Sequence, residues 1–360
     1  MNGVTPNSAT EARGFSVIEI LIALSITMVV MASVFMLLKK GQDSFEREPE
    51  VTDMTASARA GLMRVSQDLM VAGFNTPANM AVMWLDGGQK NPDELTIVYA
   101  DPEIPVSRPV SCMSNDGMIC DTIGASTVLH IDAAIFSPMP LVMESAYQEG
   151  MTLFALQGPN GDPACDHVKP GITRFEILEP PKCTGAGGAT TTANRCGTLS
   201  LKHSPSEAAA LHATDIFQHE VSLACAVVGR FHIAQYRVKP LPPADSPTLE
   251  RRDLALSDEW IPVSSNIENF QLQYAQGLSE LYEDETSLVP MGHDPERFIT
   301  RVRVSVSGRS ASTNLPGGSP GVFAAEDTHL RKTFATTVSL RNQLGQAQQK
   351  AIDLGLNGWN

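Results

Sequence analysis

Residues 15–38 read FSVIEILIALSITMVVMASVFMLL and form an apolar run with a single ionisable side chain, Glu19. A helix of this length spans roughly 36 Å, which is enough to cross a bilayer with some tilt. The run lacks the polar stripe that the core helix of a soluble domain shows. A cleaved secretory signal has a shorter apolar core, followed by small residues at the cleavage site. The run therefore predicts a retained membrane helix.

Glu19 is the exception within this run. A carboxylate at the bilayer centre costs about 3 kcal/mol by insertion scales, and less when it lies one turn inside the membrane. If the chain is cut after Gly14, the new amine belongs to Phe15, which shares a helix face with Glu19 at i and i+4. A negative charge also suits the positive end of the helix dipole. The alternative is a glutamate that lies at the level of the lipid headgroups.

The stretch RGFSVIEILIALSI resembles the class III signal of type IV pilins and of type II secretion pseudopilins. The shared elements are a short leader ending in Gly14, then Phe15, then Glu19 at the fifth mature position, then the apolar helix. The resemblance implies cleavage between Gly14 and Phe15 by the prepilin peptidase, and N-methylation of Phe15. It also implies that Glu19 neutralises the Phe15 amine of a neighbouring subunit in a filament.

The excess of acidic over basic residues limits the kinds of molecule that the chain is expected to bind. The 360 residues carry 26 Lys and Arg against 40 Asp and Glu, a formal net charge of −14. Nonspecific DNA binding needs cations on phosphates, so no nucleic-acid partner is expected. Arg13 precedes the apolar run but Lys39 and Lys40 follow it, and the positive-inside rule therefore favours the opposite topology. The cysteines and the pilin resemblance, rather than charge, place the large domain outside the cytoplasm.

The six cysteines all lie well beyond the membrane helix, and an even number in an oxidising compartment suggests disulfides. Cys112 and Cys120 are close enough to close a small loop and are the best single pair. The other four allow three pairings; they are Cys165, Cys183, Cys196 and Cys225. A zinc site is disfavoured because no Cys-x-x-Cys motif occurs.

The chain divides into a leader (1–14), the transmembrane helix (15–38), an amphipathic continuation of the helix (39–75), a cysteine-containing variable region (76–226), an antiparallel sheet (227–342) and a tail (343–360). Pro49 removes a helix hydrogen bond, so we expect a kink or short break near residues 48–50. Beyond it, apolar residues recur every three or four positions, and polar residues fall largely on other faces. The apolar set is Met54, Ala58, Leu62, Val65, Leu69 and Ala72, and the polar set is Arg59, Arg64, Gln67 and Asp68.

Alternating apolar and polar residues predict strands in the rest of the chain. They cover 95–100, 126–131, 151–156, 172–178, 227–238, 248–254, 267–275, 297–308 and 331–342, with a short helix at 205–220. In 297–308, Val302, Val304 and Val306 share one face. An antiparallel sheet with one apolar face packs on a helix, and the apolar set of 54–72 is the natural partner. The predicted class is α+β and type IV pilin-like: a long N-terminal helix packed on an antiparallel β-sheet, with loop-rich β insertions.

The second half of the chain carries a narrower resemblance. This half resembles PilW-type minor pilins in six places along the chain. They are Tyr236, Leu249-Glu250-Arg251, Trp260–Val263, Ile267–Tyr274, Arg301–Ser307 and Phe334–Asn342. The resemblance implies a minor pilin that takes part in type IV pilus assembly, in a tip or priming complex. Its implied partners are the prepilin peptidase, other minor and major pilins, the inner membrane and a tip adhesin. The implied location is the inner membrane, with the ectodomain in the periplasm, and the pilus fibre.

No catalytic motif is found: the sequence lacks Gly-x-Ser-x-Gly, a Walker loop and His-Glu-x-x-His. We expect no enzyme activity and no cofactor. The acidic residues Glu280, Glu283, Asp284, Glu285, Asp294 and Glu296 favour a solvated loop over a calcium site. Arg301, Arg303 and Arg309 favour a solvent-facing strand over DNA uptake, because no aromatic residues interleave with them. Two alternatives remain: a J-type pseudopilin of type II secretion, and a membrane-anchored periplasmic enzyme or binding domain.

Overall fold

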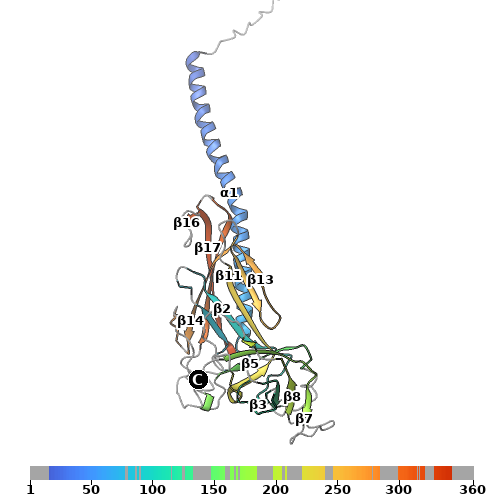
Figure 1. The fold of residues 1–360 in the computed structure, drawn as a ribbon. Coiled ribbons are helices and arrows are strands. Elements are labelled where there is room, and N and C mark those ends of the chain that lie inside the picture. The colour runs from blue at the N-terminus through green and yellow to red at the C-terminus, as the bar shows by residue number, and fades with distance from the viewer. Residues whose placement is uncertain are drawn as a thin grey trace, which may run out of the picture.

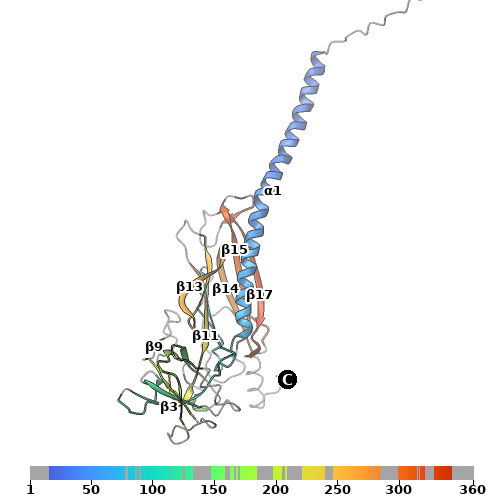
Figure 2. The same cartoon turned by 90° about the vertical axis from the view of Figure 1, so that its right-hand side faces the viewer.

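One long helix and a set of antiparallel sheets form most of the part of the chain that the structure describes (Figure 1). The structure is a computed structural model, and it describes residues 16–77, 80–85, 87–88, 91–114, 116–123, 126–132, 147–158, 163–165, 168, 171–184, 198–204, 207–208, 221–239, 246–277, 279–283, 299–313, 315, 317–320 and 328–342. Helix α1 (Val17–Val71) is 55 residues long. Its first half projects from the sheets, and its second half lies along them (Figures 1 and 2).

The strands are β1 (Val82–Leu85), β2 (Glu94–Ala100), β3 (Pro109–Met113), β4 (Val128–Asp132), β5 (Thr152–Gln157), β6 (Gly171–Glu176), β7 (Lys182–Thr184), β8 (Thr198–Lys202), β9 (Glu207–Ala208), β10 (Ala226–Gly229), β11 (Phe231–Lys239), β12 (Thr248–Asp253), β13 (Ser257–Ser265), β14 (Ile267–Gln276), β15 (Ile299–Thr313), β16 (Ser319–Pro320) and β17 (Thr328–Ser339). Two short 3-10 helices are η2 (Pro163–Cys165) and η3 (Leu223–Cys225).

The strands form two pairs of sheets. Sheets β1-β2-β11-β12-β13 and β14-β15-β17-β16 flank α1 and are called the helix-side sheets. Sheets β3-β4-β8-β7 and β10-β5-β6-β9 lie at the end away from the projecting half of α1 and are called the distal sheets (Figures 1 and 2). Because β2 pairs with β11, the segment 76–226 contributes strands to a helix-side sheet as well as to the distal sheets.

The main core lies between α1 and the helix-side sheets, as the alternation in the sequence predicts. Helix residues Ala58, Val65 and Leu69 are fully buried in one apolar cluster. Val302, Val304 and Val306 of β15 belong to the same cluster, and their neighbours Arg301 and Arg303 point the other way. The helix therefore lies on the apolar face of the sheet, and this packing fixes the direction in which its first half projects.

One buried carboxylate ties the two helix-side sheets together. Asp93, just before β2, accepts hydrogen bonds from the backbone N–H groups of Leu272 (2.7 Å) and Gly87 (3.0 Å). Its own N–H donates to the carbonyl of Phe270 at 2.8 Å. Two bonds from N–H donors satisfy the charge of a carboxylate in a buried position.

Disulfides stabilise the distal sheets. The structure joins Cys112 to Cys120, the pair that their spacing predicts. It also joins Cys165 to Cys225, which selects one of the three pairings left open, and Cys183 is disulfide-bonded as well. Closing loops of 8 and 60 residues limits the entropy of the unfolded chain.

Several expectations need correction. Of the kink or short break expected near residues 48–50, the break does not occur, because α1 runs unbroken through Pro49. Proline removes only one hydrogen bond, and the next residue, Glu50, is held by β15. Asp68 falls outside the apolar set, but it is also buried and bonded to a sheet, a contact that the sequence did not predict. Within 205–220, Glu207–Ala208 form a strand instead of a helix, and the other residues lie outside the described part.

The strand predicted at 227–238 is divided into β10 and β11 at Arg230. These two strands belong to different sheets, so the chain passes here from a distal sheet to a helix-side sheet. Strands β11 and β12 pair in an antiparallel arrangement, with Tyr236 opposite Arg251. Strand β13 was not expected, since most of its side chains are exposed and the pattern of alternation is absent.

The close approach of α1 to β15 depends on Gly308, and this can be tested by replacing it with valine. A Cβ at Gly308 would lie 3.0 Å from Cγ and 3.3 Å from the carbonyl oxygen of Met54. Because the helix backbone cannot move aside freely, Gly308→Val should lower the free energy of unfolding by about 1–3 kcal/mol. Urea unfolding of the full chain in detergent, followed by circular dichroism, measures this. Gly41→Ala, with no atom within 4 Å of the new Cβ, is the matched control and should not lower stability. Equal stability of the two variants would contradict the packing account.

Candidate functional site

The first half of α1 is a long apolar surface without protein cover. Its large apolar side chains between Val17 and Leu38 are all exposed, from 44% for Val34 to 76% for Val17. It is the one described helix that is long and apolar enough to cross a membrane, and its most apolar window has no buried residue. A patch of this size in water would drive association, so the segment is suited to an apolar environment.

The hydroxyl groups within this segment are satisfied inside the helix. Ser25, Thr27 and Ser33 donate to the carbonyls of Leu21 (2.8 Å), Ala23 (2.7 Å) and Val29 (2.9 Å), each four residues earlier. Such bonds remove the need for an outside partner, which an apolar medium cannot supply. The segment therefore exposes only hydrocarbon over most of its length.

Glu19 differs from the three hydroxyl residues. It lies in the first turn of α1, where the carbonyl of Ser16 accepts bonds from the N–H groups of Glu19 (3.0 Å) and Ile20 (3.2 Å). Among the described residues, its carboxylate has no hydrogen bond or ion pair. Gly14 and Phe15, the predicted cleavage and methylation residues, lie outside the described part of the chain. The structure thus places Glu19 at the start of the helix and leaves its pairing as a prediction.

A polar segment of α1 follows the apolar half. This segment begins with Lys39 and Lys40. The Gln42 side chain then donates a hydrogen bond to Glu46 at 3.3 Å, and the Ser44 hydroxyl donates one to Glu48 at 3.0 Å. These i,i+4 pairs support a helix that projects into solvent without packing on the sheets. The polar segment separates the apolar half from the packed half.

Where α1 meets the sheets, Glu50 bonds the end of β15. Its carboxylate accepts hydrogen bonds from the N–H of Ala311 (2.8 Å) and the hydroxyl of Ser312 (2.6 Å). The bond from Ser312, above all, holds the pKa of Glu50 below its usual range. Going along the chain, the projecting half of the helix therefore ends at Glu50, and the half that packs on the sheets begins there.

At the other end of α1, Asp68 joins the helix to the sheet. Its Oδ2 accepts from the Tyr236 hydroxyl (2.7 Å) and from Nε of Arg251 (2.8 Å), and Arg64 lies 3.6 Å from Oδ1. Burial and the Asp68 charge raise the pKa of Tyr236 well above its usual range, so its proton stays on the hydroxyl. Burial opposes the charge of Arg251, but Asp68 outweighs it and raises the pKa of Arg251. Sequence reasoning missed this role because the partners lie far from Asp68 in the sequence.

The network extends across the sheet from Arg251. Arg251 lies 3.4 Å from Asp253, which accepts from Nδ1 of His232 at 2.8 Å. Burial raises the pKa of Asp253, but His232 and Arg251 lower it to a net value below its usual range. His232 also stacks on Tyr99, with ring centroids 5.0 Å apart. Each of these side chains contacts another residue of the sheet, so the network has a structural role in holding the sheet together.

The arginines of β15 and the acidic run are the remaining candidate residues. Arg303 stacks over the Tyr282 ring at 4.1 Å, and Arg301 donates to the Ser279 carbonyl. Within the described residues, no group of His, Cys, Asp or Glu could hold a metal ion. Residues 284–298, which carry most of the acidic run, lie outside that part.

The comparisons with known proteins find matches among solved structures alone. No family model and no curated protein matches the chain. Among solved structures, it is similar to a type IV-like pilin from Thermus thermophilus, at 12% sequence identity and a TM-score of 0.20. The match covers 54% of this chain and 86% of that chain.

Removing the Asp68 carboxylate should loosen the packed half of the helix. Asp68→Ala leaves the Arg251 charge and the Tyr236 hydroxyl without their main partner, so we expect a loss of about 3–5 kcal/mol in the free energy of unfolding. Arg64→Ala is the control, because Arg64 is 45% exposed and such a pair contributes about 0–1 kcal/mol. Thermal unfolding followed by near-ultraviolet circular dichroism measures both. A smaller effect for Asp68→Ala than for Arg64→Ala would refute the proposed contribution of Asp68.

The bond between Glu50 and β15 should weaken in acid. Because the pKa of Glu50 in the folded state is below the usual 4.5, its ionised form contributes stability above that pH. This contribution is lost as the pH falls through the lowered pKa. Glu50→Gln should reduce stability near neutral pH and have less effect below about pH 4. Unfolding midpoints from pH 3 to 7 give the comparison, and a constant difference across that range would contradict it.

Proposed function

We propose that this protein is a minor pilin of the PilW type, which takes part in type IV pilus assembly. The observation that carries the proposal is the division of α1 into an uncovered apolar half and a half packed on antiparallel sheets. A soluble domain has no use for such a helix, whereas a filament subunit needs it twice. It first anchors the subunit in the inner membrane and then packs against other such helices in the filament.

The apolar half suits both surroundings. Lipid chains and neighbouring apolar helices are similar solvents, so the transfer between them depends on packing and on the few polar groups present. The three hydroxyl groups need no new partner in either place, because they bond within the helix. Glu19 does need one, and the proposed partner is the amine of Phe15 on a neighbouring subunit after the prepilin peptidase has cut at Gly14.

The sheets supply the ectodomain, which we place in the periplasm and then in the fibre. The resemblance to PilW-type pilins in β11, β12, β14, β15 and β17 supports a place among other minor pilins in a tip or priming complex with the major pilin. No catalytic role is proposed for this chain. A J-type pseudopilin would use the same helix in a secretion system, and the phenotype of a deletion distinguishes the two. Loss of pili with normal secretion supports the pilin.

Processing and the charge pair can be tested together on the full-length protein from its own cells. Mass spectrometry should find a mature chain that begins at Phe15 with one added methyl group. Glu19→Ala should leave cleavage intact and reduce incorporation into pili at least about tenfold, because an unpaired amine is then left in the apolar filament core.

Ser25→Ala is the matched control for this experiment, since its hydroxyl bonds only to its own helix and incorporation should not change. Normal piliation of Glu19→Ala would remove the charge-pairing role. A mature protein that retains residues 1–14, or that is cut further along the chain, would overturn the pilin assignment itself.

A further inference from the structure

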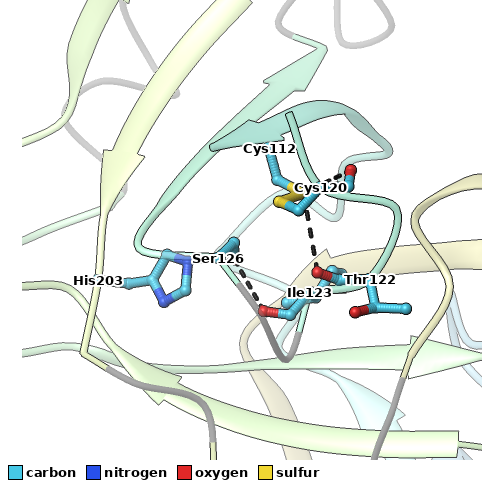
Figure 3. The surroundings of a disulfide bond; sticks show 6 residues. All are labelled: Cys112, Cys120, Thr122, Ile123, Ser126 and His203. Carbon is cyan, nitrogen blue, oxygen red and sulfur yellow. Dashed lines mark hydrogen bonds between the residues drawn. A yellow bond between two sulfur atoms is a disulfide. The ribbon is translucent and has the colours of Figure 1, made fainter. Parts of the chain in front are cut away.

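A rigid hairpin projects from the distal sheets. It continues from β3 as residues 112–120, and the Cys112–Cys120 disulfide closes it (Figure 3). Ser114 N–H donates to the Met118 carbonyl at 2.9 Å, and Gly117 N–H donates to the Ser114 carbonyl at 3.0 Å. Gly117 has a φ of +73°, a value that suits glycine at this turn. The backbone of the hairpin is thus held by bonds within it as well as by the disulfide.

The base of the hairpin is equally well held. Ile123 N–H donates to the Val221 carbonyl at 2.9 Å, and Leu223 N–H donates to the Asp121 carbonyl at 3.0 Å. Ser126, which follows, donates to the Ile123 carbonyl at 2.8 Å, as Figure 3 shows. These bonds connect the hairpin to the segment that contains Cys225, itself disulfide-bonded to Cys165. The hairpin therefore keeps a fixed orientation on the distal sheets.

This fixed hairpin exposes large apolar side chains on both of its faces. Ile119 is 82% exposed and Met118 is 69% exposed. Met113 is paired with Ile119 across the hairpin, so these two side chains share one face and Met118 lies on the other. Exposed apolar side chains on a flexible loop would have little meaning, but here the backbone that carries them is held in place. A preorganised apolar surface loses little further entropy when it binds.

We propose that hairpin 112–120 inserts into a groove of a partner protein that has apolar walls and a cationic residue at its end. A ribbon with apolar side chains on both faces fits a groove better than a flat surface. Asp116 lies at the turn, and residues 112–123 contain no Lys or Arg. Entry into a bilayer would carry the Asp116 carboxylate in first and would bring Asp121 towards anionic headgroups, so a lipid surface is disfavoured. A cation at the end of a protein groove meets Asp116 instead.

The first experiment identifies the partner protein that contains the groove. A photo-crosslinking benzoylphenylalanine replaces Ile119 in the full chain, expressed in its own cells, and Ile261 on β13 carries the same probe as the control. Ile261 is 61% exposed but lies in a different sheet. We expect one crosslinked protein from position 119 that is absent from position 261. Crosslinks to lipid alone, to a second copy of this chain, or to no protein would each overturn the proposal.

The second experiment measures direct binding between the purified full chain and the crosslinked protein. Met118→Ser and Ile119→Ser should each weaken binding about tenfold or more, as for buried anchor residues, and Ile261→Ser should not. Asp116→Lys should also weaken binding, with a smaller loss at high salt. Unchanged circular dichroism of the variants shows that the fold is intact. Equal affinity of the Ile119→Ser and Ile261→Ser variants would refute the groove, whatever the outcome for the pilin assignment.

Discussion

The packing of α1 against the two helix-side sheets is the constraint on which the rest of the structure depends. A helix of 55 residues is continuous in its backbone, so the direction of its free half is set wherever its other half is bound. Ala58, Val65 and Leu69 provide the apolar contact, and the absence of a side chain at Gly308 lets the helix backbone approach β15 closely. Burial of this face gives the helix its position without any contact to the apolar half.

Polar contacts at both ends of the packed segment prevent the helix from sliding along the sheets. Apolar packing alone is not directional, and a shift by one turn would bury a similar area. Such a shift would separate Asp68 from Arg251 and Tyr236 at one end and Glu50 from Ser312 at the other. An unpaired buried charge such as that of Asp68 is more costly than the pair is favourable, so this contact specifies the register of helix and sheet more than it adds stability. The more exposed contact of Glu50 attaches the helix at a second point.

Patterns that are local in the sequence predicted the matching parts of the fold. The apolar residues of 54–72 and the alternation of Val302, Val304 and Val306 each describe one element, and their pairing follows because each has one apolar face. The contact of Asp68 with Arg251 was not predicted, because a helical pattern contains no information on a residue that is 183 positions away. Strand β13 was missed because an edge strand with two exposed faces shows no alternation. The Cys165–Cys225 pair required the contact of η2 and η3, which spacing alone does not reveal.

The candidate site, too, could be predicted from the sequence only in part. Glu19 was found from the sequence because one carboxylate in a run of hydrocarbon is evident without a structure. The bonding of Ser25, Thr27 and Ser33 within the helix needed coordinates, since the same residues could equally have served as contacts between helices. Once these hydroxyls are satisfied, Glu19 is the polar group of the apolar half that still needs a partner.

The apolar half of α1 and hairpin 112–120 expose apolar side chains that call for different surroundings, and their charges explain why. The apolar half of α1 carries its carboxylate in the first turn, near one edge of a bilayer, and hydrocarbon fills the interior. The hairpin of Met118 and Ile119 carries Asp116 at its leading turn, where a bilayer would meet the charge first. Strand β3, from which the hairpin continues, also lies at the end of the molecule away from the projecting half of α1 (Figures 1 and 2). A subunit anchored by its helix would therefore hold the hairpin away from the membrane, where a protein groove rather than lipid is available to cover it.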